Sequence, residues 1–278
     1  MYVLCSPCIL DPDLRAEGIT HSSDLELFRR ARDRCTEFGI EMLPLPCPET
    51  LYLGPGRKPG TFLERLNTPE FSLLLEELTK KISRIIQKKG RPLCIVGVNS
   101  SPTCGVTSTY YGDCNGGSPK REGRGVFLAK FPDIRAIDVG LFSQYRVYLA
   151  APLFSEAERA YNAKIAAMLR DRYFHVHLPQ DIGDCIASRD AGDHKEIFAK
   201  NLEELKNSDI VVAVIDGSDA DSGTAWEMGY AYASGKQVIG IRTDFRRAGD
   251  HELVNLMLEM SSTVFGSTND LLNFFGLS

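Results

Sequence analysis

The stretch that decides the fold is residues 209–241, DIVVAVIDGSDADSGTAWEMGYAYASGKQVIGI. It opens with a continuous apolar run over 210–215, which is typical of a strand buried on both faces. A helix is predicted over 224–234, where Gly235 ends it, and a second strand over 238–241. Strand, helix and strand in this order predict two parallel strands joined by a crossover helix.

The same alternation continues on both sides of this stretch. Upstream, the periodicity predicts strands over 147–151 and 174–178 and helices over 155–171 and 191–207. Downstream, it predicts two more helices, over 252–260 and 269–275. We therefore expect residues 143–278 to form a doubly wound, flavodoxin-like α/β domain with a mostly parallel sheet flanked by helices.

The first half of the chain follows a similar order of elements. A helix over 68–89 is indicated by Thr68 as its N-cap and Pro69 at its first position. Residues 1–138 are therefore expected to form a second α/β domain. The further elements expected here are strands over 2–4, 40–45 and 93–98, a helix over 24–38, a loop over 111–124, a strand over 125–130 and a connector over 131–145.

Composition narrows the class of protein. The chain has 278 residues with 43% hydrophobic and 25% charged side chains, which is ordinary for a globular protein of one or two domains. Its net charge of -5 gives no basic surface for a nucleic-acid backbone. Its apolar runs are far shorter than the roughly 20 residues that span a bilayer, and its start does not resemble a signal peptide. We expect a cytoplasmic protein that binds neither membranes nor nucleic acids.

Polar residues gather where the strand over 210–215 ends, which is where open α/β sheets bind ligands. Asp216 and Asp221 follow the strand, Gly223 permits a close approach, and Glu227 lies about two turns further on. Two carboxylates that face one pocket suit glycosyl transfer, because one attacks the anomeric carbon and the other handles the proton of the departing base. On spacing alone, a solvated loop and a surface helix residue are the favoured interpretation.

The wider pattern resembles the nucleoside 2-deoxyribosyltransferase family over about residues 146–265. The resemblance is carried by DGSDADSGTAWEMGYAYASGK, by DIVVAVI before it and by YLAAPLF upstream. It implies that Glu227 is the nucleophile that forms a covalent deoxyribosyl-enzyme and that Asp221 contacts and protonates the base. It also implies that Tyr148 orients the nucleophile and that Gln180 helps to hold the base. The expected substrates are small nucleosides or nucleobases.

Two further positions bear on substrate and assembly. Asn255, in VNLM, matches a residue that binds sugar hydroxyls in a neighbouring subunit's pocket, so the resemblance implies a homo-oligomer, a dimer or higher. Asn201 stands where some members place an Asp that contacts the sugar or base, and an amide cannot carry that negative charge. Two alternatives stay open: an N-glycosidase that hydrolyses deoxynucleosides or their monophosphates, and a nucleoside-binding or sensing protein without turnover.

The eight cysteines are unevenly placed, with seven before residue 115. Cys8, Cys47 and Cys104 each follow a predicted strand of the first half, and such loops converge at one edge of a parallel sheet. Thiolates are soft ligands for iron–sulfur clusters or zinc, whereas cytoplasmic cysteines are usually buried as small hydrophobic residues. Spacing alone favours neither interpretation.

The motifs SPCILDP, LPLPCPE and NSSPTCG resemble, in this order, those of the thiouracil desulfidase family. The resemblance covers about residues 1–130 and implies a 4Fe-4S cluster held by Cys8, Cys47 and Cys104, with one iron open to sulfur. It implies a supporting role for Ser101 toward the substrate and an acid or base role for Glu49. Zinc is the weaker alternative because no second C-x-x-C motif accompanies Cys5 and Cys8, and a purely structural domain is another. We expect an enzyme that processes nucleosides, with thiolated bases as its special case.

Overall fold

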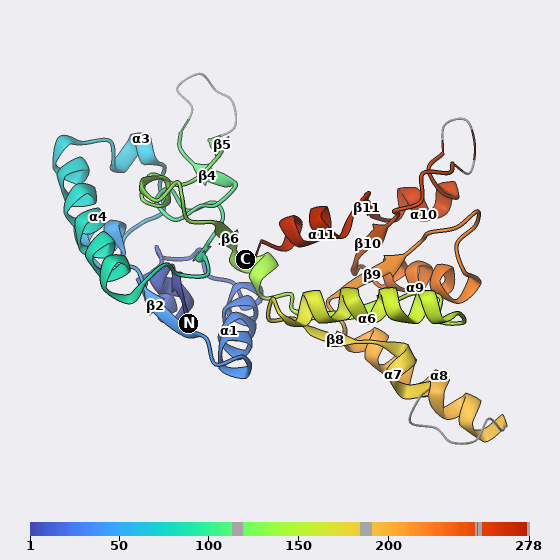
Figure 1. Cartoon of the computed structure of the whole chain (residues 1–278). Helices are drawn as coiled ribbons and strands as arrows, with labels where there is room; N and C mark the ends of the chain where they lie inside the picture. Colours follow the sequence, from blue (N-terminus) through green and yellow to red (C-terminus); the bar gives the residue numbers. More distant parts are fainter. Residues whose placement is uncertain (113–118, 184–190, 248, 250–251, 277–278) are drawn as a thin grey trace. The chain divides into compact units, whose positions relative to one another are not determined.

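The computed structural model describes residues 1–112, 119–183, 191–247, 249 and 252–276. The chain forms two compact units, Met1–Ser143 and Gln144–Ser278 (Figure 1). In each unit helices pack against a parallel sheet, so the predicted α/β fold class is confirmed. Within the described residues, the helices are too short or too polar to cross a membrane.

The sheet of the first unit has four strands, all parallel, in the order β2-β1-β3-β6. The central strand β1 is buried along its whole length, which agrees with the apolar sequence at the start of the chain. The carboxyl ends of β1, β2 and β3 meet at one edge of the sheet, where the cysteine-bearing loops begin. The strands are β1 (Tyr2–Cys5), β2 (Glu41–Pro44), β3 (Ile95–Gly97) and β6 (Ala136–Asp138).

Two long helices cover this sheet. The connection from β1 to β2 carries α1 (Ser22–Glu37), and the connection from β2 back to β3 carries α4 (Pro69–Lys89). Because the two connections run in opposite directions, right-handed crossovers place these helices on opposite faces (Figure 1). The first turn of α4 is capped as predicted, since the Thr68 hydroxyl accepts a hydrogen bond from Phe71 N at 3.1 Å. The shorter elements are η1 (Pro7–Ile9), η2 (Pro12–Leu14), α2 (Pro48–Leu53), α3 (Phe62–Arg65), β4 (Ser108–Tyr110), β5 (Lys120–Glu122), η3 (Leu128–Lys130) and α5 (Val139–Phe142).

Three sequence predictions in this unit are wrong. The loop expected over 111–124 contains β5, which pairs antiparallel with β4, and the strand expected over 125–130 is a turn followed by η3. The connector expected over 131–145 contains β6 and α5. These elements are only three or four residues long, so their sequences carry no readable period, and pairing with distant segments decides their conformation.

The sheet of the second unit has five strands, all parallel, in the order β11-β10-β9-β7-β8. The chain passes from β7 to β8 in one direction and then crosses back to β9, so the topological switch point lies between β7 and β9. The strands are β7 (Arg146–Ala150), β8 (His175–His177), β9 (Ile210–Val214), β10 (Gln237–Ile241) and β11 (Thr263–Phe265). The short strand β11 was not expected from the sequence.

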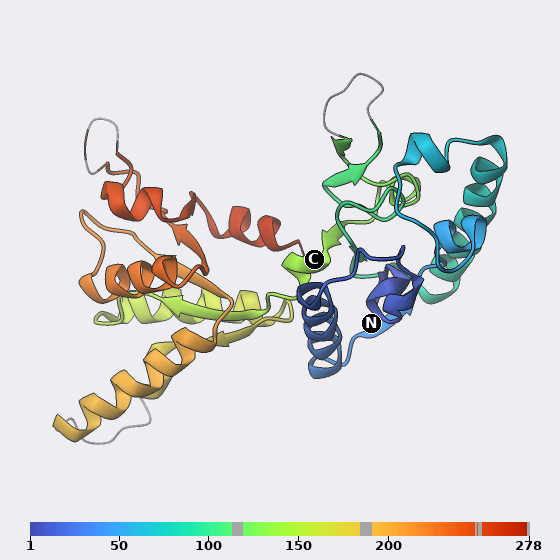
Figure 2. The same ribbon diagram turned by 180° about the vertical axis from the view of Figure 1, so that it is seen from behind.

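Helices cover both faces of this sheet. The helix α6 (Glu156–Arg170) lies on one face, and α8 (Ala191–Asn207) and α9 (Ser222–Ala233) lie side by side on the other (Figure 2). The remaining helices are α7 (Pro179–Gly183), α10 (Leu256–Met260) and α11 (Thr268–Phe275). The helix expected from residue 252 begins only after Asn255, whose side-chain oxygen accepts a hydrogen bond from Met257 N and caps α10.

Strand alternation decides which side chains of β7 face α8 and α9. In the register, Tyr148 lies opposite Val211 and Ala150 lies opposite Ala213. These four side chains belong to one buried cluster with Leu205 of α8 and Met228 of α9. Since successive residues of a strand point to opposite faces, Tyr148 is directed into the layer between the sheet and these two helices.

Candidate active site

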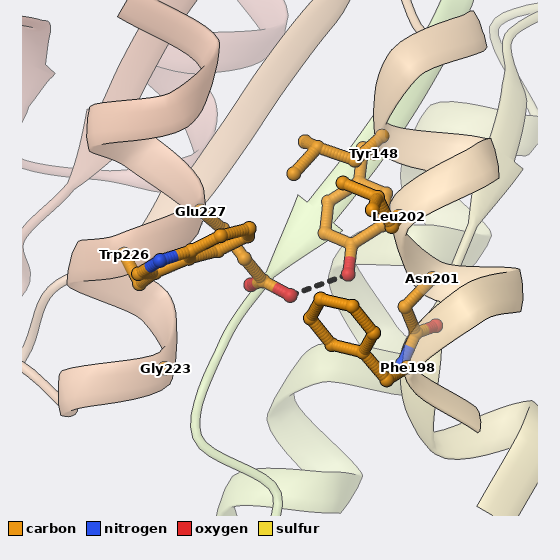
Figure 3. A pocket seen from close by; sticks show the side chains of 8 residues that line it. Tyr148, Phe198, Asn201, Leu202, Gly223, Trp226 and Glu227 are labelled. Atoms are coloured by element: carbon orange, nitrogen blue, oxygen red, sulfur yellow. Dashed lines mark hydrogen bonds between the residues drawn. The ribbon is translucent and has the colours of Figure 1, made fainter. Parts of the chain in front are cut away.

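The second unit contains a cavity of about 350 Å³ beside the switch point of its sheet. Its walls come from β7, α8 and α9, and most of its surface is apolar or aromatic (Figure 3). It is lined by Tyr148, Phe198, Asn201, Leu202, Leu205, Gly223, Trp226 and Glu227. The size and the mixture of aromatic surface with a few polar groups are typical of a small-molecule site.

The central polar contact of the cavity joins two residues that are 79 positions apart. The hydroxyl of Tyr148 donates a hydrogen bond to Oε1 of Glu227 at 2.5 Å (Figure 3). Tyr148 is fully buried in β7, and Glu227 lies on the second turn of α9. A rigid strand and a rigid helix therefore fix the orientation of the carboxylate.

The surroundings of this pair shift the pKa values of both Glu227 and Tyr148. Burial raises the pKa of Glu227 to about 7, the hydrogen bond from Tyr148 lowers it, and the charge of Asp221 raises it. Burial and the neighbouring Glu227 charge raise the pKa of Tyr148, so the phenol keeps its proton and remains a donor. A carboxyl group whose pKa lies near neutrality, in a cavity, is typical of a functional group.

The start of α9 is built by Asp221 itself. Its Oδ2 accepts hydrogen bonds from Thr224 N at 3.0 Å and from the Thr224 hydroxyl at 3.4 Å, so Asp221 is the N-cap of α9. A Cβ on Gly223 would lie 3.0 Å from the same Oδ2. Asp221 does not line the cavity, but its charge acts on Glu227.

Sequence reasoning missed the aromatic wall. Trp226 is 51% exposed, its ring stacks on Tyr230 with centroids 5.5 Å apart, and Phe198 lies 6.2 Å away on α8. Exposed rings of this size beside a carboxylate offer a surface on which a planar base can stack. The available signal was Trp226, the only tryptophan of the chain, directly before Glu227.

Asn201 also lines the cavity, from α8, and it has a partner that the sequence did not suggest. Its Oδ1 lies 3.0 Å from Nε2 of His177 on β8. The His177 ring in turn stacks on the Tyr148 ring, with centroids 5.2 Å apart and planes 24° apart. Asn201, His177, Tyr148 and Glu227 thus form one contiguous chain of contacts.

Three other predicted substrate residues lie outside the lining of the cavity. Gln180 is buried against α6, where Nε2 donates to Arg159 O at 3.1 Å and Oε1 accepts from Asn162 Nδ2 at 3.4 Å. Asp216 accepts hydrogen bonds from Thr243 and from the backbone of Asp244, and these tie the loop after β10 to β9. Asn255 is exposed and caps α10.

The first unit brings several of its predicted site residues together. Oε1 of Glu49 accepts hydrogen bonds from the hydroxyl of Ser101 at 3.2 Å and from that of Thr103 at 2.8 Å. Its other oxygen accepts from Arg57 Nε and Nη2 at 3.3 and 3.2 Å. Glu49 thus has hydrogen-bond donors at both of its oxygens, and the loop before Cys104 is tied to it. Thr103 and Arg57 were not singled out in the sequence.

The three candidate ligand cysteines also interact with one another. Cys47 is the N-cap of α2, and its sulfur accepts hydrogen bonds from the Thr50 hydroxyl at 3.2 Å and from Thr50 N at 3.4 Å. Burial raises the pKa of Cys8 to about 12 and raises that of Cys104, and the charge of Cys47 adds to both increases. Cys8 acts in the same way on Cys104.

The chemistry of these three cysteines suits an iron–sulfur cluster better than a single metal ion. Over the described ranges, no group of three or more His, Cys, Asp or Glu side chains could hold a metal ion as the thiols stand. In a cluster each thiolate binds a different iron, so its ligands stay farther apart than those of a single ion. Three soft donors that follow three neighbouring strands fit that chemistry.

The loop of Cys104 is packed against neighbouring backbone through glycines. A Cβ on Gly97 would lie 2.6 Å from Cys104 O, and one on Gly125 would lie 2.8 Å from Cys104 N. A Cβ on Gly105 would lie 2.6 Å from Ser108 O. The other described cysteines, Cys5, Cys35 and Cys94, are buried in the same unit, and Cys114 and Cys185 lie outside the described residues.

Comparison with known proteins assigns the second unit. Residues 147–271 match the family model of the nucleoside 2-deoxyribosyltransferases, and the search of curated proteins found no match. A solved 2-deoxyribosyltransferase from Bacillus psychrosaccharolyticus is 30% identical over 46% of this chain and 90% of its own, with a TM-score of 0.40. A conserved protein from Enterococcus faecalis V583 is 30% identical over 48% of this chain and 97% of its own, with a TM-score of 0.41.

The second unit therefore belongs to the nucleoside 2-deoxyribosyltransferase family, a family of enzymes that act on nucleosides, and the resemblance read from the sequence is confirmed. Another solved structure is that of a 4Fe-4S-dependent thiouracil desulfidase. It is 17% identical over 49% of this chain and 89% of its own, with a TM-score of 0.34.

Proposed function

We propose that the second unit breaks the N-glycosidic bond of 2′-deoxynucleosides through a covalent intermediate on Glu227. The observation that carries this proposal is the hydrogen bond from Tyr148 to Glu227 in the wall of an aromatic cavity. The phenol holds Oε1, and among the described residues Oε2 has no hydrogen-bond donor. An ionised, oriented carboxylate with one free oxygen is a competent nucleophile.

In the first step, a bond forms between Oε2 of Glu227 and C1′ of the sugar while the bond from C1′ to the base nitrogen breaks. The base leaves with the bonding electron pair and takes up a proton, for which Asp221 is the proposed donor. In the second step, another base or a water molecule attacks C1′ and gives up its proton to the Asp221 carboxylate, while the ester bond to Oε2 breaks and restores Glu227. Two displacements at C1′ retain its configuration.

The acceptor distinguishes transfer from hydrolysis. Capture by a second base is deoxyribosyl transfer, and capture by water is N-glycosidase activity, on deoxynucleosides or their monophosphates. A protein that binds nucleosides without turnover is the third alternative. We favour transfer because the aromatic wall of Trp226 and Phe198 can hold a second planar base after the first has left.

The decisive experiment compares Glu227→Ala with the wild type. Each is incubated with a deoxynucleoside, alone and with a second base, and the products are separated by chromatography. We expect the substitution to lower base release by at least about 10³-fold, because the nucleophile is lost. Glu203→Gln, an exposed change on α8, is the matched control. Undiminished base release by Glu227→Ala would refute the assignment, and binding of nucleoside without any product in the wild type would favour the sensing alternative.

We also propose that the protein is at least a dimer, in which Asn255 reaches the cavity of a partner copy. The support is that Asn255 is exposed and lies outside the cavity of its own unit. Light scattering on the full chain tests this proposal, and a monomer at working concentration would contradict it.

For the first unit we propose that Cys8, Cys47 and Cys104 hold a 4Fe-4S cluster and that the site removes sulfur from thiolated bases. The support is that the three cysteines follow three neighbouring parallel strands, beside the network of Glu49, Ser101 and Thr103. A bound cluster with an open iron would supply a Lewis acid for the sulfur of the substrate. Ser101 would orient the substrate, and Glu49, held by Arg57, would accept a hydrogen bond from it or exchange a proton with it.

Anaerobic purification with analysis for iron and acid-labile sulfide tests this second proposal. We expect both elements, together with loss of sulfur from 2-thiouracil in the presence of the holoprotein. Zinc in place of iron would overturn the cluster, and iron and sulfide without desulfuration would leave the cluster in place but overturn its catalytic role.

A further inference from the structure

The amide of Asn201 is oriented by a contact with His177. Its Oδ1 lies 3.0 Å from His177 Nε2, and since a carbonyl oxygen can only accept, Nε2 carries the proton. His177 does not line the cavity, so the oxygen is turned away from the cavity. In Figure 3 the amide nitrogen of Asn201 lies on the side of Phe198. Among the described residues, Nδ2 has no acceptor.

His177 is itself held in place by the strand and by a ring. It is paired with Tyr148 in the register of β7 and β8, and its imidazole stacks on the phenol at a centroid distance of 5.2 Å. Tyr148 is fully buried. The position of Nε2, and with it the orientation of the Asn201 amide, is therefore set by the sheet and does not depend on the ligand.

We propose that His177 is a positioning residue that makes Asn201 a hydrogen-bond donor toward the base, so that the site selects bases with an acceptor edge over bases with an amino group there. This inference rests on the proposed function, because it names the substrate class of the same cavity. The class is 6-oxopurines and 4-oxopyrimidines.

The selection follows from the hydrogen-bonding edges of the bases. A free amide can bind adenine with both of its ends, taking the amino hydrogen on Oδ1 and giving a hydrogen to N7. Because Oδ1 is directed toward His177, which lies outside the cavity lining, the amide offers the cavity its donor end. Hypoxanthine and guanine present two acceptors, O6 and N7, to that donor, whereas adenine presents N7 alone, beside an amino group that cannot accept a hydrogen bond from the amide.

The first measurement compares hypoxanthine with adenine as ligands. The chain has one tryptophan, Trp226, and it lines the cavity, so the change of its fluorescence reports binding without any turnover. We expect the wild type to bind hypoxanthine about tenfold more tightly than adenine or better, and to show the same ratio in kcat/KM for deoxyinosine over deoxyadenosine. Equal binding, or a preference for adenine, would overturn the proposal.

Three variants separate the hydrogen bond from the stacking. His177→Phe keeps a ring on Tyr148 and removes the donor, so we expect the preference for the 6-oxo base to fall to about one. His177→Gln keeps an amide donor near the position of Nε2 and should retain the preference for the 6-oxo base. Asn201→Asp offers a carboxylate oxygen to the cavity and should reverse the preference, so that adenine binds more tightly than the 6-oxo base. An unchanged preference in both His177→Phe and Asn201→Asp would overturn the proposal.

The two readouts also distinguish this inference from the proposed function. If the wild type binds hypoxanthine selectively but releases no base from any deoxynucleoside, the proposed reaction fails and the role of His177 stands. If base is released but the preference is absent or insensitive to His177, the reaction stands and the positioning role fails.

Discussion

The hydroxyl of Tyr148 lies 2.5 Å from Oε1 of Glu227, and the two side chains come from a buried strand and from the second turn of a helix. This contact opposes the larger effect of burial, which raises the pKa of Glu227 to about 7. Since the nucleophile must be ionised, we expect kcat/KM to rise with pH and to reach half of its maximum near pH 7.

Replacing Tyr148 with Phe should move the acidic limb of the pH profile, the part over which kcat/KM rises with pH, to higher pH. The phenol stabilises the charged carboxylate, so its removal raises the pKa of Glu227, by about one unit for a single hydrogen bond. The measurement is the pH profile of kcat/KM. Tyr161→Phe, on α6 and away from the cavity, is the control and should leave the limb in place. A limb that does not move in Tyr148→Phe would show that the hydrogen bond does not tune the nucleophile.

Glu227→Gln should stabilise the fold at high pH. The ordinary pKa is 4.5 and the folded value is about 7, so the folded protein holds a proton that the unfolded chain releases. Wild-type stability therefore falls as pH rises through this window, and the neutral amide does not share that loss. At pH 8 we expect a gain of about 1–3 kcal/mol in the free energy of unfolding, and at pH 4 little gain. Urea unfolding at both pH values measures it, and equal effects at the two values would contradict the prediction.

Asp221 has two separable tasks, capping α9 and handling the proton of the base. Asp221→Asn keeps an acceptor for Thr224 N, whereas Asp221→Ala loses it and should destabilise the protein by about 1 kcal/mol. Both variants lack the carboxyl group, so both should release base more slowly. Thermal unfolding and base release are measured on each. Wild-type activity in Asp221→Asn would reduce Asp221 to a helix cap.

Cys47→Ala should abolish binding of iron to the first unit, because it removes one of the three proposed ligands. Cys35→Ala is a suitable control, since Cys35 is buried in α1 away from the strand ends. Iron content and the visible absorbance of the anaerobically purified proteins are the measurements. Equal iron in the two variants would remove Cys47 from the ligand set.

The sequence predicted those parts of the molecule that are determined locally. The apolar strand β9, the cap of α4 by Thr68 and the helix that carries Glu227 all follow from short-range patterns. The strand β6 was not predicted from the sequence, because three residues are too few to show an alternation of apolar and polar side chains. It forms through its pairing with β3. The contact of His177 with Asn201 could not be predicted for a related reason, since it depends on the register between β7 and β8 and on the packing of α8.

The glycines around Cys104 set a limit on how this protein can vary. At Gly97, Gly105 and Gly125 the main chains approach so closely that even one methyl group would collide with a carbonyl or an amide. The local shape is therefore dictated by peptide units, and a neighbouring side chain cannot compensate by repacking. In a deep mutational scan that scores only abundance in cells, these three positions should accept no other residue, whatever chemistry the loop performs.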